Sequence, residues 1–266
     1  MSVLDDIIDG VREDLTARRS RVALEEVRAL AEQAPAPRDA FAALNASNSG
    51  VRIIAEVKRK SPSKGSLSEI QDPAELAAAY ERGGAAVVSV LTEERRFGGS
   101  LADLDAVRAS VNLPILRKDF TVDEYQIWEA RAHGADLILL IVAALPDEEL
   151  RALLALTHEL GMNALVETHT PEEVERAVAL GGRIIGVNVR NLKTLDIDRS
   201  VFGTLAGLIP AGAVVVAESG VRDIADVEQF VAEGAHAVLV GEALVRHENP
   251  EATVRTFTRA GSALHN

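Results

Sequence analysis

Charged residues stand directly after short apolar runs at several points along the chain. Glu56 and Lys58 follow the first of these runs, Lys118 follows another, and Glu167 and Glu218 end two more. If the runs are strands, Glu56 and Lys58 share a face, because side chains alternate along a strand. A single charge after a strand is usually a solvated loop residue. A whole set that mixes ammonium groups with carboxylates predicts general acid–base catalysis on an anionic substrate.

Further side chains at the ends of the same runs come in pairs. Lys118 and Phe120 are two residues apart, and so are Asn188 and Arg190. Each pair is therefore expected on one strand face. If the strand ends meet at one place, these side chains converge with the charged ones on a central site.

Two later loops predict a phosphate site. Ser219 with Gly220, and Gly241 with Glu242, stand just before helical stretches. Backbone amides at helix starts bind phosphate, and in barrel enzymes the late loops supply them. Glu242 can donate its amide there only if its side chain turns outward. The alternative is that the glycines only make tight turns.

Lysine is scarce in this chain. Five of the 28 basic residues are lysine, and the other 23 are arginine. All five follow predicted strands, where a compact, titratable ammonium group has a use that arginine cannot fill. Lys58 and Lys118 are the strongest catalytic candidates, whereas Lys60, Lys64 and Lys193 are equally consistent with ordinary loop positions.

The elements that must position these residues follow from the hydrophobic pattern. The predicted strands are 52–57, 85–91, 113–116, 136–142, 164–167, 184–189, 213–217 and 237–240. The predicted helices between and after them are 73–82, 101–110, 123–133, 146–160, 171–180, 200–208, 223–233 and 250–260. Continuously apolar strands that alternate with helices predict an α/β fold with a parallel sheet. Eight such units predict a single (β/α)8 TIM barrel, with a doubly wound open sheet as the alternative.

The first fifty residues have a different pattern. Residues 3–18 carry one apolar stripe at helical spacing, and a second helical stretch spans 23–33 before two prolines. We therefore expect residues 1–50 to form an N-terminal helical extension and 51–266 to form the barrel catalytic domain. Together they would make one structural domain.

Composition excludes several classes of function. The chain of 266 residues has a net charge of −13 and no cysteine, which removes disulfides, thiolate nucleophiles and cysteine-ligated metals. The charge argues against nucleic acid or an anionic membrane as partner, although 58–65 is a basic run. No secretory signal is recognisable, and the longest apolar run, 137–145, is about half a membrane span. We expect a cytoplasmic protein that binds no nucleic acid and no membrane.

Other chemistries have little support in the sequence. His169 stands two residues after Glu167, but no second histidine has metal-ligand spacing, so all six histidines are expected to be structural or surface residues. The glycine patterns of dinucleotide sites, P-loops and serine hydrolases are missing.

Seven motifs in order along the chain resemble those of the indole-3-glycerol-phosphate synthase family. They are IAEVKRKSPSKG (54–65), TEERRFGGS (92–100), LRKDF (116–120), ALVETH (164–169), GVNVRNL (186–192), AESGV (217–221) and VLVGEAL (238–244). The resemblance covers nearly the whole chain. It implies a carboxy-lyase that converts 1-(2-carboxyphenylamino)-1-deoxyribulose 5-phosphate into indole-3-glycerol phosphate, carbon dioxide and water, with no cofactor and no metal. A small anionic substrate is the implied partner, and we expect a monomer, with a weak dimer as the alternative.

The resemblance also implies roles for individual residues. Lys118 would be the general acid that polarises the ketose carbonyl, and Glu167 would act in the later dehydration, assisted by Lys58, which Glu56 orients. The residues that would hold the ribulose hydroxyls and the charge state of the lysines are Asn188 and Glu218. The implied contacts to the anthranilate part are Ser61 and Arg190 at its carboxylate, with Phe97 and Phe120 as apolar walls. The implied phosphate ligands are Ser219, Gly220, Gly241 and the amide of Glu242.

Three other functions remain compatible with these residues. An aldolase would form a Schiff base on Lys118 or Lys58, and borohydride trapping would detect it. A sugar-phosphate isomerase would release no carbon dioxide. A binding barrel without catalysis would be unaffected by Lys118→Ala or Glu167→Gln.

Overall fold

The strands close into a parallel barrel in this computed structural model, which describes residues 3–46, 50–61, 65–66, 70–192, 194–246 and 249–260. Going round the barrel, the strands are β1 (Arg52–Val57), β4 (Val87–Leu91), β5 (Ile115–Lys118), β6 (Leu137–Ile141), β7 (Asn163–Thr168), β8 (Ile184–Asn188), β9 (Val214–Glu218) and β10 (Ala237–Val240). The first and last strands pair in parallel and complete the ring. The predicted (β/α)8 barrel is confirmed, and the open sheet is wrong.

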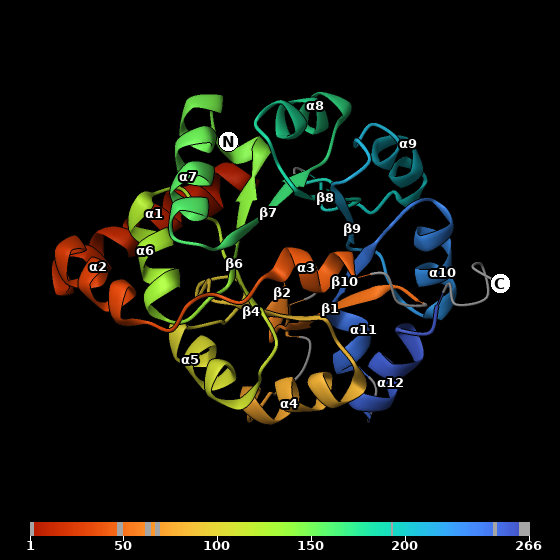
Figure 1. The fold of residues 1–266 in the computed structure, drawn as a ribbon, viewed down its shortest axis with the longest axis horizontal. Helices are drawn as coiled ribbons and strands as arrows, with labels where there is room; N and C mark the ends of the chain where they lie inside the picture. Colours follow the sequence, from red (N-terminus) through yellow and green to blue (C-terminus); the bar gives the residue numbers. More distant parts are fainter. Residues whose placement is uncertain are drawn as a thin grey trace.

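Helices surround the barrel, one after each strand, as Figure 1 shows. They are α4 (Pro73–Gly83), α5 (Leu101–Ser110), α6 (Glu124–Ala132), α7 (Asp147–Glu159), α8 (Pro171–Ala179), α9 (Phe202–Ala206), α10 (Ile224–Ala232) and α12 (Pro250–Phe257). Side chains of Asp72, Ser100, Asp123, Thr170 and Asp223 accept backbone N–H groups at five of the helix starts. These caps explain why the predicted starts agree with the observed ones.

Several short elements depart from the predicted pattern. The expected helix 200–208 is divided into a 3₁₀ turn, η2 (Arg199–Val201), and the short helix α9. A second 3₁₀ turn, η1 (Val142–Ala144), follows β6, and a one-turn helix, α11 (Glu242–Val245), follows β10. The loop after β1 forms a small antiparallel hairpin of β2 (Lys60–Ser61) and β3 (Gly65–Ser66).

The N-terminal residues form α1 (Val3–Arg21), α2 (Leu24–Gln33) and α3 (Ala40–Asn45). The buried side chains of α3 belong to the same apolar cluster as the first inward residues of the strands. Its Phe41 amide donates to Asn163 at the start of β7, and its ring stacks under Arg183. This helix therefore closes the amino-terminal end of the barrel, across which it lies in Figure 1. Apolar residues of α1 join the same cluster, near η1 at the carboxyl end.

Strand side chains alternate between two apolar layers, as the period of two requires. The inward set in the barrel interior includes Ile54, Leu116, Leu165, Ile184 and Val216. The neighbouring outward residues pack against the outer helices in a second cluster. One step further along β1, β5, β7 and β9, the next inward positions are the predicted site residues Glu56, Lys118, Glu167 and Glu218.

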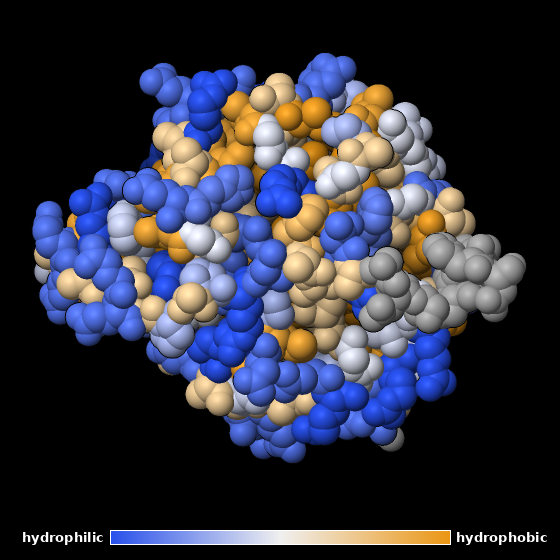
Figure 2. All heavy atoms as spheres, in the orientation of Figure 1, coloured by the Kyte–Doolittle hydropathy of each residue, from blue (hydrophilic) through white to orange (hydrophobic). Residues whose placement is uncertain are grey.

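The outer surface is mostly polar. On the face drawn in Figure 2, hydrophilic side chains cover much of the outer helices. Among the described residues, none of the helices has the length and hydropathy needed to cross a membrane.

Candidate active site

One cavity of about 720 Å³ opens at the carboxyl ends of the strands. All the residues predicted for the site line it: Glu56, Lys58, Ser61, Phe97, Lys118, Phe120, Glu167, Asn188, Arg190, Glu218, Ser219, Gly220, Gly241 and Glu242. The barrel thus brings together side chains that lie up to about 190 positions apart in sequence. Of the other lysines, Lys60 is exposed with its stem beside Gly98, and Lys64 and Lys193 lie outside the described residues.

Lys118 lies between two buried carboxylates at the centre of the cavity. Its Nζ is 3.4 Å from Glu167 Oε2 and 3.5 Å from Glu218 Oε2. Burial alone would lower the pKa of Lys118, but Glu167, Glu218 and Glu56 outweigh burial and raise it. Lys118 is therefore an ammonium group at neutral pH, with a proton available for a substrate oxygen.

Glu56 and Lys58 form a second, adjacent ion pair. Lys58 Nζ lies 2.6 Å from Glu56 Oε1, and Ser89 Oγ donates to Glu56 Oε2 at 3.3 Å. Burial would raise the pKa of Glu56, but Lys58, Lys118 and these hydrogen bonds lower it below its usual value. Glu56 is therefore an ionised anchor, which fixes the ammonium group of Lys58 at the cavity wall.

Glu167 and Glu218 have opposite protonation preferences, although they share Lys118. Burial would raise the pKa of Glu167, but Lys118, His169 and Asn188 lower it well below its usual value. Burial and the charge of Glu167 raise the pKa of Glu218, and neither of its oxygens has a hydrogen-bond partner among the described residues when it is ionised. Two carboxyls with separated pKa values supply one base and one acid at the same pH.

Apolar side chains form one wall of the cavity. The rings of Phe97 and Phe120 lie 6.1 Å apart at an angle of 43°. Val3, Leu4 and Ile7 of α1 complete this side of the cavity. A flat aromatic group fits such a wall, and the N-terminal extension takes part in forming it.

The opposite end of the cavity offers backbone amides and arginines. Ser219 and Gly220 both have positive φ, 70° and 82°. They lie before α10 rather than at its start, because Asp223 caps that helix with its own carboxylate. Gly241, in contrast, directly precedes α11.

Arginine side chains surround this end. Glu242 lies 2.7 Å from the exposed Arg246, and Arg199 donates to the Gly220 carbonyl at 2.9 Å. Arg190 donates to the Leu195 carbonyl at 3.0 Å, and its amide donates to Asn188 Oδ1. Arginine and N–H groups therefore lie at this end beside the carboxylates of Glu242 and Asp198, and such groups can hold an anion.

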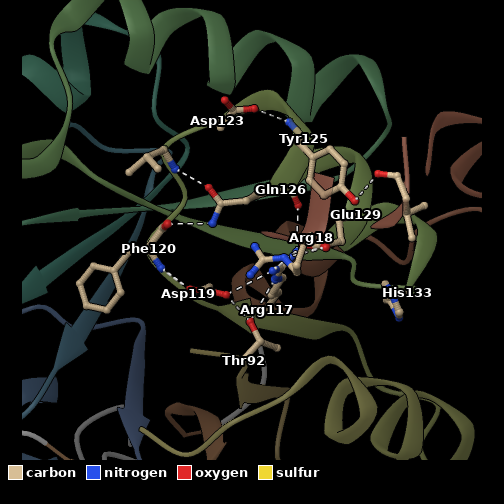
Figure 3. A network of polar contacts seen from close by, with 12 residues as sticks. Arg18, Thr92, Arg117, Asp119, Phe120, Asp123, Tyr125, Gln126, Glu129 and His133 are labelled. Atoms are coloured by element: carbon tan, nitrogen blue, oxygen red, sulfur yellow. Dashed lines mark hydrogen bonds and ion pairs between the residues drawn. The ribbon is translucent and has the colours of Figure 1, made fainter. Parts of the chain in front are cut away.

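A buried polar network around Arg117 and Asp119, drawn in Figure 3, holds the end of β5. Arg117 points away from the barrel interior and lies 3.2 Å from Asp119 and 2.9 Å from Glu129 of α6. Asp119 accepts the Phe120 amide, and Glu129 also accepts from Arg18 of α1 at 3.0 Å. The network connects α1 and α6 to the strand end that carries Lys118, so these elements together fix its direction.

Sequence reasoning missed two groups at the site. His169 was expected to be structural or exposed, but its Nε2 lies 3.3 Å from Glu167 Oε1. The apolar residues of α1 were recognised as helical, but nothing in the sequence placed them at the cavity. Among the described residues, no group of His, Cys, Asp and Glu side chains is arranged to hold a metal ion.

The fold and the site define a (β/α)8 barrel whose cavity holds paired lysines and carboxylates between an aromatic wall and an end lined with arginines. The family described as indole-3-glycerol phosphate synthase matches residues 4–257. The chain belongs to this family. Its members are carboxy-lyases of tryptophan biosynthesis, so the expected family and activity are confirmed.

Several curated relatives cover almost the whole chain. An indole-3-glycerol phosphate synthase of Paenarthrobacter aurescens (strain TC1) is 65% identical over 99% of this chain and 98% of its own. One of Micrococcus luteus is 64% identical over 98% of each chain. Among solved structures, 3-hexulose-6-phosphate synthase superimposes with a TM-score of 0.64 at 16% identity, over 79% of this chain and 99% of the other. That structure shares the barrel alone.

Proposed function

We propose that the described cavity converts 1-(2-carboxyphenylamino)-1-deoxyribulose 5-phosphate into indole-3-glycerol phosphate, carbon dioxide and water by lysine and glutamate acid–base catalysis. One observation carries this proposal. The Lys118 ammonium lies between an ionised carboxylate, Glu167, and a carboxyl whose pKa is raised, Glu218, inside a cavity with an aromatic wall. The relatives' names supply the reaction, and the geometry supplies the groups that it needs.

The first step is ring closure followed by loss of carbon dioxide. A bond forms between the aromatic carbon that carries the carboxylate and the ketose carbonyl carbon. The carbonyl oxygen takes a proton from Lys118 as it becomes a hydroxyl. The bond between the ring and the carboxylate then breaks and carbon dioxide leaves. The electron pair of the broken bond stays with the ring and restores its aromaticity. An apolar wall of Phe97 and Phe120 favours this step because it keeps water from the departing carboxylate.

The second step is dehydration. Lys58 gives a proton to the new hydroxyl, which leaves as water, while Glu167 takes a proton from the neighbouring carbon and the indole double bond forms. Glu56 keeps Lys58 in reach through its 2.6 Å contact. Asn188 and Glu218 would hold the ribulose hydroxyls, and Glu218 would also return a proton to Lys118.

The two anionic groups of the substrate would contact different residues, although Arg190 and Glu242 lie near enough to interact. Arg190 and Ser61 would contact the anthranilate carboxylate. The phosphate would bind to the amides of Ser219, Gly220, Gly241 and Glu242. Arg199 supports the phosphate position because it lines the cavity and its guanidinium contacts the Gly220 carbonyl.

Product fluorescence tests the proposal directly. The wild-type enzyme, given the carboxyphenylamino substrate, should produce indole fluorescence and release one carbon dioxide per product. Lys118→Met and Glu167→Gln should each lower kcat by at least about 10²-fold, as positioned acids and bases do. Borohydride labelling of Lys118 in the presence of substrate would contradict proton transfer and favour a Schiff base instead.

A cytoplasmic location and a monomer, with a weak dimer as the alternative, complete this proposal. A small phosphorylated substrate supports the location. Light scattering between about 1 and 100 μM protein would test the assembly state: a mass near 28 kDa throughout supports the monomer, and a stable larger mass refutes it.

A further inference from the structure

His169 is a buried imidazole held between two carboxylates, one of which lines the cavity. Its Nε2 lies 3.3 Å from Glu167 Oε1, and its Nδ1 lies 3.1 Å from Glu173 Oε2. The side chain is only 10% exposed, and it does not line the cavity. Nε2 makes no hydrogen bond within the described part of the chain, so its 3.3 Å contact with Glu167 Oε1 is an ion pair.

The start of α8 explains why Glu173 is available to His169. The side chain of Thr170 accepts the Glu173 amide and caps the helix. Glu173 Oε2 reaches back and accepts the His169 amide at 2.7 Å as well as facing the ring. A capping threonine with a glutamate three residues later is a common helix-start arrangement, and here it fixes a carboxylate under the imidazole.

The charged groups near the His169 ring, among the described residues, come from four strands and helices. Glu167 from β7 and Glu173 from α8 contact it, Glu218 from β9 interacts with it electrostatically, and Lys118 from β5 contacts the other oxygen of Glu167. Burial would lower the pKa of His169, but the two contacting carboxylates raise it to about 10. The ring is therefore an imidazolium at neutral pH.

We propose that His169, clamped by Glu173, is a positioning residue that holds the Glu167 carboxylate in the orientation and the ionised form needed for proton transfer. Glu167 Oε1 faces His169 and Asn188 Nδ2, whereas Oε2 faces Lys118. The carboxylate is thus held on its first oxygen by His169 and Asn188, and its second oxygen is directed at Lys118 and the reacting centre. This inference rests on the proposed role of Glu167.

The test compares the pH dependence of kcat in four variants. In His169→Ala, kcat at neutral pH should fall about tenfold, with KM within about twofold of wild type because the ring does not line the cavity. The acid limb of the plot of kcat against pH should move up by about one pH unit. Loss of the positive charge beside Glu167 raises the pKa of that carboxylate. His169→Gln restores a donor without the charge, so kcat should largely recover while the shifted limb remains.

Two further variants complete the design. His133 forms a comparable imidazole–carboxylate pair with Asp105 at 2.7 Å, away from the cavity, so His133→Ala is the matched control and should change neither kcat nor its pH profile. If His169→Ala does not fold, Glu173→Gln should still move the acid limb in the same direction. An acid limb that stays at the wild-type position in His169→Ala, or in Glu173→Gln, overturns the inference. Absence of indole product from the wild-type enzyme would instead refute the proposed function.

Discussion

Gly186 in β8 leaves the space that Glu218 occupies, and replacing it with alanine tests how closely the site is built. A Cβ added there would lie 2.0 Å from Glu218 Oε1 and 3.1 Å from its Cδ, whereas ordinary contact begins at 3.4 Å. The carboxylate would have to retreat by about 1.4 Å, the difference between these distances. Glu218 is only 1% exposed, and Leu165 Cδ1 would lie 3.2 Å from the same Cβ, so the side chain has little room to swing.

We expect Gly186→Ala to lower both stability and turnover. Overpacking of this kind costs about 1–3 kcal/mol, measurable as a shift of the urea midpoint. A displacement near 1 Å of a group that contacts Lys118 should lower kcat by roughly 10²-fold, measured by indole fluorescence. Gly207→Ala is the control, because its φ is −64° and the nearest atom to its Cβ would be 3.4 Å away. Wild-type kcat in Gly186→Ala would show that the position of Glu218 does not matter for turnover.

Three further predictions concern other parts of the molecule. Arg117→Met should cost about 3–5 kcal/mol in urea unfolding, because buried Asp119 loses its cation and buried Glu129 keeps only Arg18; an unchanged midpoint would contradict this. Ile7→Ala should raise KM several-fold with kcat within about twofold, since Ile7 contributes to the apolar wall and takes no part in the ion pairs around Lys118; equal losses in both constants would argue against that role. Folding raises the pKa of His169 from 6.5 to about 10, so its stabilisation is complete below pH 6.5 and is lost as pH rises to 10. Glu218, whose pKa is raised to about 8, adds its own slope below that pH, so His169 is isolated between pH 8 and 10. There the unfolding free energy should fall by about 1.4 kcal/mol per pH unit, and this slope should disappear in His169→Gln.

The barrel could be predicted from sequence because its signals are local. Each strand is a continuous apolar run, since both faces are covered, and most outer helices begin at a capping residue. The alternation within a strand then determines which side chains face the centre. Glu56, Lys118 and Glu218 could be assigned to the site because each occupies an inward position at a strand's carboxyl end.

Pairings between distant segments could not be predicted in the same way. No local pattern indicates that α3 closes the barrel, because its contacts with Asn163 and Arg183 exist only after closure. Arg117 pairs with Glu129 only because α6 packs against β5, and no local pattern indicates that packing. His169 is different, because the Thr170 and Glu173 spacing was a readable helix-start signal that placed a carboxylate beside it. The spacing between histidines, which indicates a metal site, does not reveal this pairing of His169 with carboxylates.

The net charge of the chain and the charge of the cavity lead to opposite expectations for an anionic substrate. The whole chain carries −13. In the cavity, however, Lys58 and Lys118 balance Glu56 and Glu167, and the raised pKa of Glu218 favours its neutral form. The arginines of the lining then stand against the carboxylates of Asp119, Asp198 and Glu242, so the lining is close to neutral although the chain is strongly negative. Interactions between exposed charges decay within about 10 Å in physiological salt, so the acidic outer helices contribute little at the cavity. The buried pairs are screened far less, and they decide whether a carboxylate and a phosphate can enter together.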